Sequence, residues 1–403
     1  HVCYIHQLFC TNEGAGGTRS YDISRHLAAM GHQVTVICGL FDIGGLEKSP
    51  WWKPIRKVRI DGFDVVVCKA FYSNHHGPLR RLFSFLQFVL LASIAICRVS
   101  RLDLVFATSL PLMVGIPGYI GAKVYRIPFV FEVRDLCPEG EVIMGFLRKG
   151  SLVERSLGVL ERFLYRVADR ICVVSPGFKT RLVERGYDPD LIRTVLLGAD
   201  KELFEVPEDM EFRRQYGLES KTIAVYAGSH GRTYGLSYIL KAAEKLQDRS
   251  DIAIVLIGDG NQKSLLLAQA KEMGLTNVTF IGFMAKQDLS KILAVCDIGL
   301  IILHDVGQRP VCPNKVFDYF CSGLPIIINF PGPAWDLIQK EGAGLYAAPD
   351  NPAELAVRIR QLVDDPVRIQ SIAAAARQAG LKYDRKIIAE QLAEVFQDVL
   401  STA

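Results

Sequence analysis

Short apolar runs rich in β-branched residues alternate with amphipathic stretches along the whole chain. The runs show little alternation of polar and apolar positions, which is typical of strands covered on both faces of a parallel sheet. Because these strands alternate with helical patterns, the sequence predicts an α/β fold with two doubly wound Rossmann-like domains. The predicted strands are VCYIHQLF, VTVICG, DVVVCKA, DLVFATS, FVFEVRD, RICVVS and RTVLLG in the front half, and TIAVYAG, AIVLIGDG, VTFIGF, IGLIIL, LPIIINF and GLYAAP in the rear half.

The domain boundary is predicted where the strand pattern gives way to polar sequence containing proline, around residues 198–208. We expect a first domain over residues 1–199 and a second over 200–385. A helix over 386–403 is expected to pack back on the first domain. Ligands of open parallel sheets bind beyond the carboxyl ends of the strands, so we expect the two domains to face a common cleft.

Glycine-rich turns follow the first strand of each predicted domain. A dinucleotide fingerprint would need a third glycine at position 19, where Arg19 stands, so that assignment fails. The turns instead let the backbone approach an anion closely at a helix amino terminus, and a flexible surface turn is the alternative. The residues of these turns are Gly16, Gly17 and Arg19 in the front half, and Gly228, Ser229 and Arg232 in the rear half. Gly258 and Gly260 end the next strand of the rear half and form a further predicted cradle.

Two further segments carry candidate chemistry. The strand and turn FVFEVRDLCPEG holds Glu132, Arg134, Asp135 and Glu139, which predicts the rim of a cleft; an internal Arg134–Asp135 network is the alternative.

In the rear half, Pro313-Asn314 can begin a helix that carries Lys315 and Asp318 on one side. This cation and carboxylate could take the diphosphate and the ribose hydroxyls of a nucleotide. A capped helix with an ion pair is the alternative.

Composition and charge narrow the class of protein. At 403 residues and 50% hydrophobic content the chain can bury two cores, and its ten cysteines include no CxxC pair, which favours a reducing cytosolic compartment. The only Asp-x-Asp, Asp188-Pro-Asp190, lacks a setting at a strand end, so we expect no metal site.

Positive charge is concentrated in the front half. Residues 1–200 hold 25 Lys and Arg against 18 Asp and Glu, whereas residues 201–403 hold 22 against 25. Basic pairs such as Arg80-Arg81 and Arg148-Lys149 lie beside apolar stretches, of which 82–97 is too short for an ordinary membrane span. We therefore expect a buried or interfacial helix there, peripheral association with an anionic membrane, and no nucleic-acid partner. A solvated basic surface is the alternative for the charge, and a transmembrane helix for residues 82–97.

The order and spacing of GAGGTR, GHQVTVICG, EVRD, YAGSHGRTYG, IGDGN, GLTNVTFIGF and PNKVFDYFCSGLPIII resemble the family 4 retaining glycosyltransferases of the GT-B fold. The forms EVRDLCPE and PNKVFDY are similar to the bacterial branch that builds O-antigen and capsule. The resemblance implies that the front domain binds the acceptor and the rear domain a nucleotide sugar, commonly UDP-linked, without a metal or other cofactor. It also implies that Gly16, Gly17 and Arg19 lie near the donor phosphates, that Gly282, Phe283 and Met284 read the base, and that Asp318 binds the ribose.

The chain also departs from that family. Pro310 stands where the family has a glutamate that contacts the sugar, and Ser229 and Tyr234 replace its usual arginine and lysine. We therefore expect Arg232, Arg309 and Lys315, with Asn314 beside them, to meet the diphosphate, and an amino-deoxy or N-acetylated sugar to be transferred.

The expected activity is retaining transfer of that sugar to a polyprenyl-diphosphate-linked acceptor at the inner face of the cell membrane. Glu132, Asp135 and Glu139 are the candidates to position the acceptor, and Arg134 and Lys315 complete the candidate catalytic set. A nucleotide-sugar epimerase and a non-catalytic sugar-nucleotide-binding protein are the alternatives.

Overall fold

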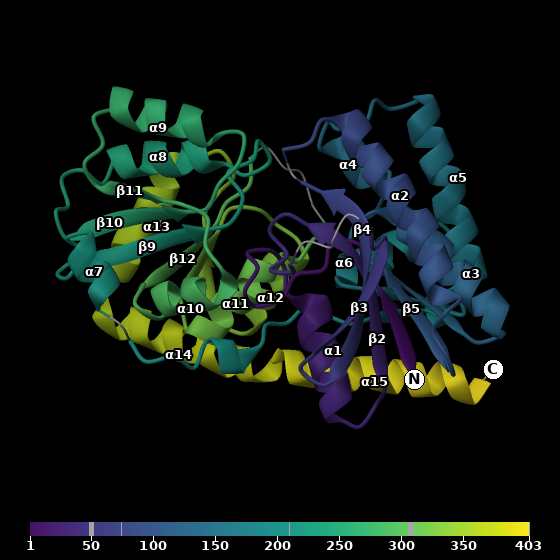
Figure 1. The fold of residues 1–403 in the computed structure, drawn as a ribbon. Coiled ribbons are helices and arrows are strands. Elements are labelled where there is room, and N and C mark those ends of the chain that lie inside the picture. Colours follow the sequence, from purple (N-terminus) through teal and green to yellow (C-terminus); the bar gives the residue numbers. More distant parts are fainter. Residues whose placement is uncertain (48–51, 74, 209, 305–309, 403) are drawn as a thin grey trace. The chain divides into compact units, whose positions relative to one another are not determined.

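The computed structural model describes residues 1–47, 52–73, 75–208, 210–304 and 310–402. The chain forms two compact units, each with its own sheet (Figure 1). Unit 1 contains His1–Leu196 and Arg385–Ala403, and unit 2 contains Leu197–Asp384. The divisions therefore lie at 196/197 and 384/385, where the sequence predicts 199/200 and 385/386.

Unit 1 is built on an eight-stranded sheet of order β3-β4-β2-β1-β5-β6-β7-β8. Neighbouring strands are parallel except for β3 and β4, which pair antiparallel at one edge. β3 was not predicted from the sequence; its three basic residues are typical of an exposed edge strand. The strands are β1 (Val2–Ile5), β2 (Val34–Phe41), β3 (Ile55–Ile60), β4 (Phe63–Tyr72), β5 (Leu104–Thr108), β6 (Phe129–Val133), β7 (Arg170–Val173) and β8 (Ile192–Thr194).

Helices cover both faces of this sheet. On one face, α1 (Arg19–Ala29) and α15 (Arg385–Thr402) pack Leu27, Leu392 and Phe396 into a core with Tyr4 and Phe106. The rings of Phe106 and Phe396 meet edge to face, with centroids 5.2 Å apart. The remaining helices of the unit are α2 (Pro78–Ile96), α3 (Gly115–Tyr125), α4 (Glu139–Ile143), α5 (Leu152–Val167) and α6 (Pro176–Glu184).

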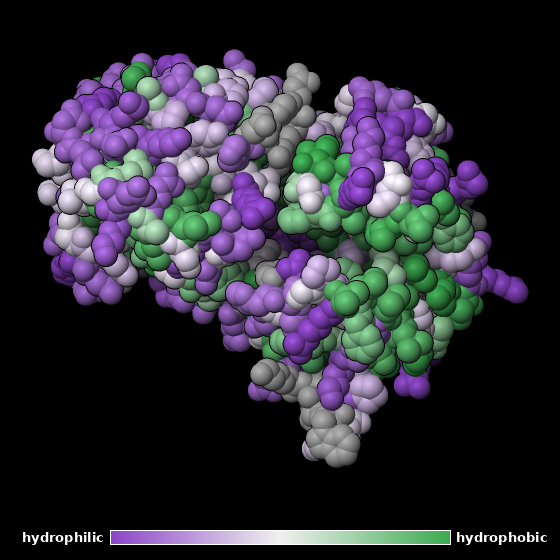
Figure 2. All heavy atoms as spheres, turned by 90° about the horizontal axis from the view of Figure 1, so that it is seen from above, coloured by the Kyte–Doolittle hydropathy of each residue, from purple (hydrophilic) through white to green (hydrophobic). Residues whose placement is uncertain are grey.

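The long apolar helix α2 lies on the surface of unit 1. Within the described residues it is the one helix that is long and apolar enough to cross a membrane, by length and composition. Of its most apolar 18-residue stretch, 28% is buried. Its inner face carries Phe88 and Ala92, whereas Leu79, Phe83 and Leu90 are 84, 66 and 62% exposed. Figure 2 shows apolar side chains gathered on the face of unit 1 that this view presents. The helix therefore has one face in the core and one apolar stripe facing outward.

Unit 2 contains a six-stranded sheet of order β11-β10-β9-β12-β13-β14, in which every pair is parallel. Its core joins Tyr226, Leu240, Ile254 and Leu300. The strands are β9 (Thr222–Ala227), β10 (Ile252–Ile257), β11 (Val278–Ile281), β12 (Ile298–Ile301), β13 (Ile326–Ile328) and β14 (Gly344–Tyr346). The helices are α7 (Glu211–Gln215), α8 (Leu236–Glu244), α9 (Lys263–Glu272), α10 (Lys286–Ala294), α11 (Asn314–Ser322), α12 (Pro333–Lys340), α13 (Pro352–Val363) and α14 (Pro366–Lys382).

The chain order of both sheets follows from the sequence pattern. In each sheet the first strand lies in the interior and later strands are added on both sides of it, with helices between consecutive parallel strands. The predicted fold class of two doubly wound Rossmann-like domains is confirmed.

Candidate active site

Two glycine loops stack at the carboxyl ends of β9 and β10 in unit 2. A Cβ atom on Gly258 would lie 2.0 Å from the carbonyl oxygen of Gly228, and one on Gly260 would lie 2.6 Å from that of His230. The φ angles of Gly228, Gly258 and Gly260 are 148°, 137° and 158°, a region that other residues rarely adopt. Glycine is therefore required at this edge of the sheet, where the two backbone turns touch.

Lys315 reaches this edge from the first turn of α11. Its Nζ lies 3.9 Å from the ring centroid of Tyr226 and 4.8 Å from that of Tyr234. A Cβ atom on Gly228 would be only 2.8 Å from the ammonium, so the glycine leaves the space that Lys315 fills. Burial lowers the pKa of Lys315 to about 7, against a smaller opposite effect of Asp318. The predicted diphosphate residue thus lies against the predicted glycine loop.

Asp318 is one turn further along α11 but does not pair with Lys315. Its carboxylate is buried and forms an ion pair of 2.5 Å with Lys286, the first residue of α10. Lys286 was not predicted from the sequence, because it is 32 positions away from Asp318. Near them, Asn314 Oδ1 is buried without a hydrogen-bond partner among the described residues. A carboxylate held in place and an unpartnered amide oxygen are therefore both found on the first turns of α11.

The other predicted donor residues surround these loops. Gly282 and Phe283 follow β11 and are exposed, and a Cβ atom on Gly282 would meet no atom within 4 Å. Ser229 and Arg232 are exposed as well, and no ion pair is formed by Arg232 within the part of the chain that the structure describes. Met284 is half-buried. Arg309 lies outside the described residues.

His230 is a residue of this site that the sequence analysis passed over. Its side chain is fully buried, and neither ring nitrogen has a hydrogen-bond partner among the described residues. Burial, and then the charge of Lys263, lowers the pKa of His230 to about 4, so the ring is neutral. Lys263 donates to the carbonyl oxygens of Gly258 and Ile281, at 2.8 and 3.2 Å, and so ties two strand ends together. A histidine in a glycine loop is a signal that could have drawn attention to this position.

In unit 1, Arg19 and Glu132 form a buried ion pair. Nε and Nη2 of Arg19 donate to Glu132 Oε1 at 3.0 and 2.7 Å, and Nη1 donates to the carbonyl oxygen of Leu196 at 2.7 Å. Thr108 Oγ1 donates to the other carboxylate oxygen at 2.6 Å. Both side chains have no exposed surface. The structure thus pairs Arg19 with Glu132, and the two residues hold α1 against β6; the expected contacts of Arg19 with donor phosphates and of Glu132 with the acceptor stay predictions.

The neighbouring charged residues are more accessible. Arg134 and Asp135 are half-buried where β6 ends, and Asp135 Oδ1 accepts a hydrogen bond from the backbone N–H of Leu136 at 2.9 Å. Glu139, at the start of α4, pairs with Arg181 at 2.9 Å. Three carboxylates are expected to position an acceptor. Glu132 is buried and Glu139 begins α4, whereas Asp135 is half-buried and lies directly after a strand end.

The predicted front glycine loop is closely packed. A Cβ atom on Gly16 would lie 2.4 Å from Cys10 Sγ, whereas Gly17 is exposed just before α1. The loop therefore brings the backbone of Gly17 to the surface at the amino end of α1.

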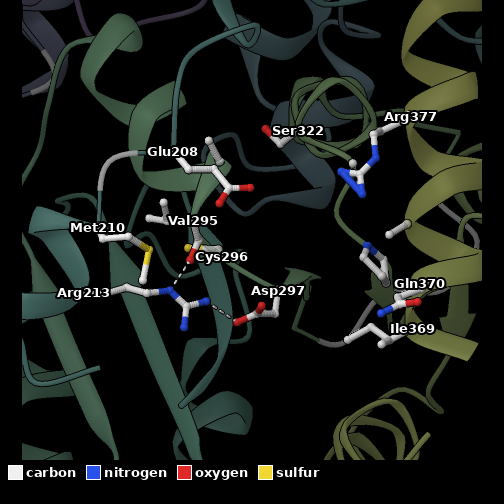
Figure 3. A pocket seen from close by; sticks show the side chains of 14 residues that line it. Glu208, Met210, Arg213, Val295, Cys296, Asp297, Ser322, Ile369, Gln370 and Arg377 are labelled. Carbon is white, nitrogen blue, oxygen red and sulfur yellow. Dashed lines mark hydrogen bonds and ion pairs between the residues drawn. The ribbon is translucent and has the colours of Figure 1, made fainter. Parts of the chain in front are cut away.

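A cavity of about 440 Å³ lies elsewhere in unit 2, at the amino ends of β12 and β13. Figure 3 shows Arg213 and Asp297 on its wall, joined by an ion pair of 2.7 Å. Arg213 also donates to the carbonyl oxygen of Val295 at 2.8 Å. Because the glycine loops are at the opposite ends of the strands, this cavity is separate from the site built around Lys315.

The chemistry of the unit 2 site suits an anion with an adjoining polar group. It combines a lysine cation, a helix amino terminus, glycine turns and a fixed carboxylate. Within the described residues, no group of three or more His, Cys, Asp or Glu side chains is placed to hold a metal ion.

Comparisons with known proteins identify the family of both units. Residues 14–198 match the family model described as a glycosyl transferase 4-like domain, and residues 208–379 match glycosyl transferases group 1. The chain is 27% identical over 278 residues to the probable glycosyltransferase WbjE of Pseudomonas aeruginosa, covering 68% of this chain and 69% of that protein.

A second relative and a solved structure extend the comparison. The chain is 22% identical over 290 residues to the N,N'-diacetylbacillosaminyl-diphospho-undecaprenol alpha-1,3-N-acetylgalactosaminyltransferase of Campylobacter jejuni, covering 70% of this chain and 74% of that protein. Anabaena HepE, solved in complex with UDP, has the same fold with a TM-score of 0.72, 20% identity and coverage of 98% of this chain and 99% of that one. The two family matches together span both units, and the chain belongs to the GT-B glycosyltransferases, with a glycosyl transferase 4-like domain followed by a group 1 domain.

Proposed function

We propose that this enzyme transfers a sugar from a UDP-linked donor to a lipid-linked saccharide in the synthesis of a bacterial surface polysaccharide. The observation that carries the proposal is the position of the Lys315 ammonium, against Gly228 and at the amino end of α11. A diphosphate placed there would meet a cation and helix N–H groups at once. HepE was solved with UDP, and the relative from Campylobacter jejuni is named for a diphospho-undecaprenol acceptor, which supports both choices of substrate.

The proposed reaction retains the anomeric configuration and needs no metal. As the bond from the anomeric carbon to the donor phosphate breaks, negative charge develops on the leaving diphosphate, and Lys315 and Arg232 are the described cations that would stabilise it. Each well-placed contact of this kind contributes about 2–4 kcal/mol. The acceptor hydroxyl gives its proton to the leaving phosphate as its oxygen bonds to the sugar. In unit 1, Asp135 is the carboxylate that we propose contacts the acceptor.

The proposed sugar is amino-deoxy or N-acetylated. Pro310, which is half-buried, stands where a glutamate would contact a hexose hydroxyl. Proline has no side-chain atom that can accept a hydrogen bond from a sugar hydroxyl. An acetamido group would instead place its apolar methyl group against the apolar proline ring.

We also propose that unit 1 associates peripherally with the inner face of the cell membrane. The exposed stripe of α2 and the exposed Phe146 offer apolar contact, and Arg80, Arg148 and Lys149 are exposed beside them. Apolar insertion combined with basic residues favours an anionic lipid surface.

A panel of nucleotide sugars would test the donor. Each compound is added to the full chain, and the thermal unfolding midpoint is measured, because a ligand bound only by the folded state raises it. UDP sugars should stabilise the protein, and the stabilising sugar should then be transferred to a polyprenyl-diphosphate saccharide with release of UDP and retained configuration. Isomerisation of the donor without an acceptor would instead identify an epimerase. Binding without turnover would identify a binding protein.

A further inference from the structure

Arg134 carries a positive charge that no described residue neutralises. It directly follows β6, two positions after Glu132, and the charges of the two residues interact. Its guanidinium makes one long hydrogen bond, 3.5 Å from Nη1 to His6 Nε2, and no ion pair with any carboxylate in the part of the chain that the structure describes. Its backbone N–H is fixed separately by Ser109 Oγ at 3.0 Å.

Glu132 is nearby but its charge is already matched. The carboxylate receives two hydrogen bonds from Arg19 and one from Thr108, which leaves the cluster of Arg19, Glu132 and Arg134 with a net positive charge. Burial lowers the pKa of Arg134 against the opposing effect of Glu132, yet a guanidinium stays protonated in proteins. The remaining N–H groups of this half-buried guanidinium have no partner among the described residues, so they can donate to an anion.

His6 holds the guanidinium without competing for an anion. Because arginine can only donate, His6 Nε2 is the acceptor, and the ring proton is on Nδ1, which donates to Ser20 Oγ at 2.7 Å. Burial lowers the pKa of His6 well below its usual value, with Arg134 acting in the same direction, so the ring is neutral. Ser20 belongs to the first turn of α1, whose amino end adds positive potential to the same edge of the sheet.

We propose that Arg134 is an anion-binding residue of unit 1 that takes a phosphoryl group of the substrate, with His6 as the residue that positions it. The planar guanidinium matches two phosphate oxygens, and it lies at the carboxyl end of the central strands, where ligands of open sheets bind. This inference rests on the proposed function, in which both substrates contain a diphosphate. The phosphoryl group can therefore come from the acceptor or from the donor.

Titration calorimetry on the full chain separates these sources. One arm titrates inorganic pyrophosphate at saturating UDP, and the other titrates UDP alone, for wild type, Arg134→Gln and the control Arg166→Gln, an exposed arginine of α5. If the group comes from the acceptor, wild type binds pyrophosphate beside UDP and Arg134→Gln binds it about tenfold to a hundredfold more weakly. If it comes from the donor, Arg134→Gln weakens UDP binding by a similar factor. Arg166→Gln should match wild type in both arms.

The proposal is overturned if Arg134→Gln behaves as wild type in both arms. Arg134→Lys keeps the charge but loses the planar fork, and an affinity between wild type and Arg134→Gln is expected; should Arg134→Gln fail to fold, an unchanged Arg134→Lys overturns the proposal. Failure of wild type to bind UDP would refute the proposed function instead, and a pyrophosphate titration without UDP would still decide the role of Arg134.

Discussion

The ammonium of Lys315 is held over the ring of Tyr226, and the hydroxyl of that tyrosine donates to the carbonyl oxygen of Ser229 at 2.9 Å. The ring is therefore fixed by the same loop that is expected to hold the donor. Asp318 forms its ion pair with Lys286, so the ammonium of Lys315 contacts the aromatic faces of Tyr226 and Tyr234, and the charge of Asp318 acts on it only as a smaller effect. Such a cation is oriented before the ligand arrives and remains available to an incoming anion.

Replacing Lys315 with methionine should remove the main cation of the donor site. Loss of about 2–4 kcal/mol of stabilisation predicts a fall in kcat/KM of roughly 30-fold to 1000-fold. The matched control is Lys271→Met, which changes an exposed lysine of α9 and should leave the rate unchanged. Steady-state kinetics with the donor found in the nucleotide-sugar panel measures both, and equal rates for the two variants would remove Lys315 from the site.

Donor affinity should depend on pH through the same residue. Because the pKa of Lys315 is about 7, the unliganded side chain loses its proton as the pH rises through that value. A bound diphosphate stabilises the charged form and raises this pKa, so binding takes up a proton, and UDP affinity should fall by up to about tenfold per pH unit above about pH 7. Calorimetry between about pH 6 and about pH 9 measures this slope. In Lys315→Met the slope should disappear, and a flat profile for wild type would contradict the assignment.

Replacing Glu132 with alanine should reduce stability strongly. The change leaves the Arg19 guanidinium buried without its carboxylate, which costs about 3–5 kcal/mol in the free energy of unfolding. The double variant Arg19→Met/Glu132→Leu removes both charges and should recover much of this loss. Urea unfolding monitored by circular dichroism gives the three values. If Glu132→Ala is as stable as wild type, the pair does not hold α1 against β6.

Charges placed on the outer stripe of α2 should prevent membrane binding. Phe83→Asp/Leu90→Asp introduces two carboxylates at positions 66 and 62% exposed, where they would face anionic lipid. Flotation with phosphatidylglycerol vesicles at low salt should recover the wild type and not the double variant, and high salt should weaken the wild type. Val367→Asp alters an apolar residue 79% exposed on α14 of unit 2 and serves as the control. Flotation of the double variant to the wild-type extent would refute this surface.

Most of the strands could be predicted from the sequence because both of their faces are buried. Each strand of a parallel sheet is therefore a short, continuous run of apolar residues that can be recognised on its own. The sequence did not predict β3, where Arg56, Lys57 and Arg59 interrupt the apolar residues, because this edge strand is only partly buried. It predicted the Gly228 loop from its place at a strand end, and Lys315 from the helix that begins at Asn314 and from the family resemblance; the structure brings the two residues together. It could not predict that Arg19 would pair with Glu132, because the two residues are 113 positions apart and the pairing depends on how α1 packs against β6.

The return of α15 to the first unit affects how the protein is made. Residues 1–196 leave the ribosome while the sequence of unit 2 is still being translated, and until α15 emerges the apolar face around Tyr4 and Phe106 lacks the part of its cover that this helix supplies. The nascent chain must therefore keep an unfinished hydrophobic surface from aggregating during that interval. Unit 2 has both its ends within the chain and can complete its core first, so the later half of the protein is expected to mature before the earlier half.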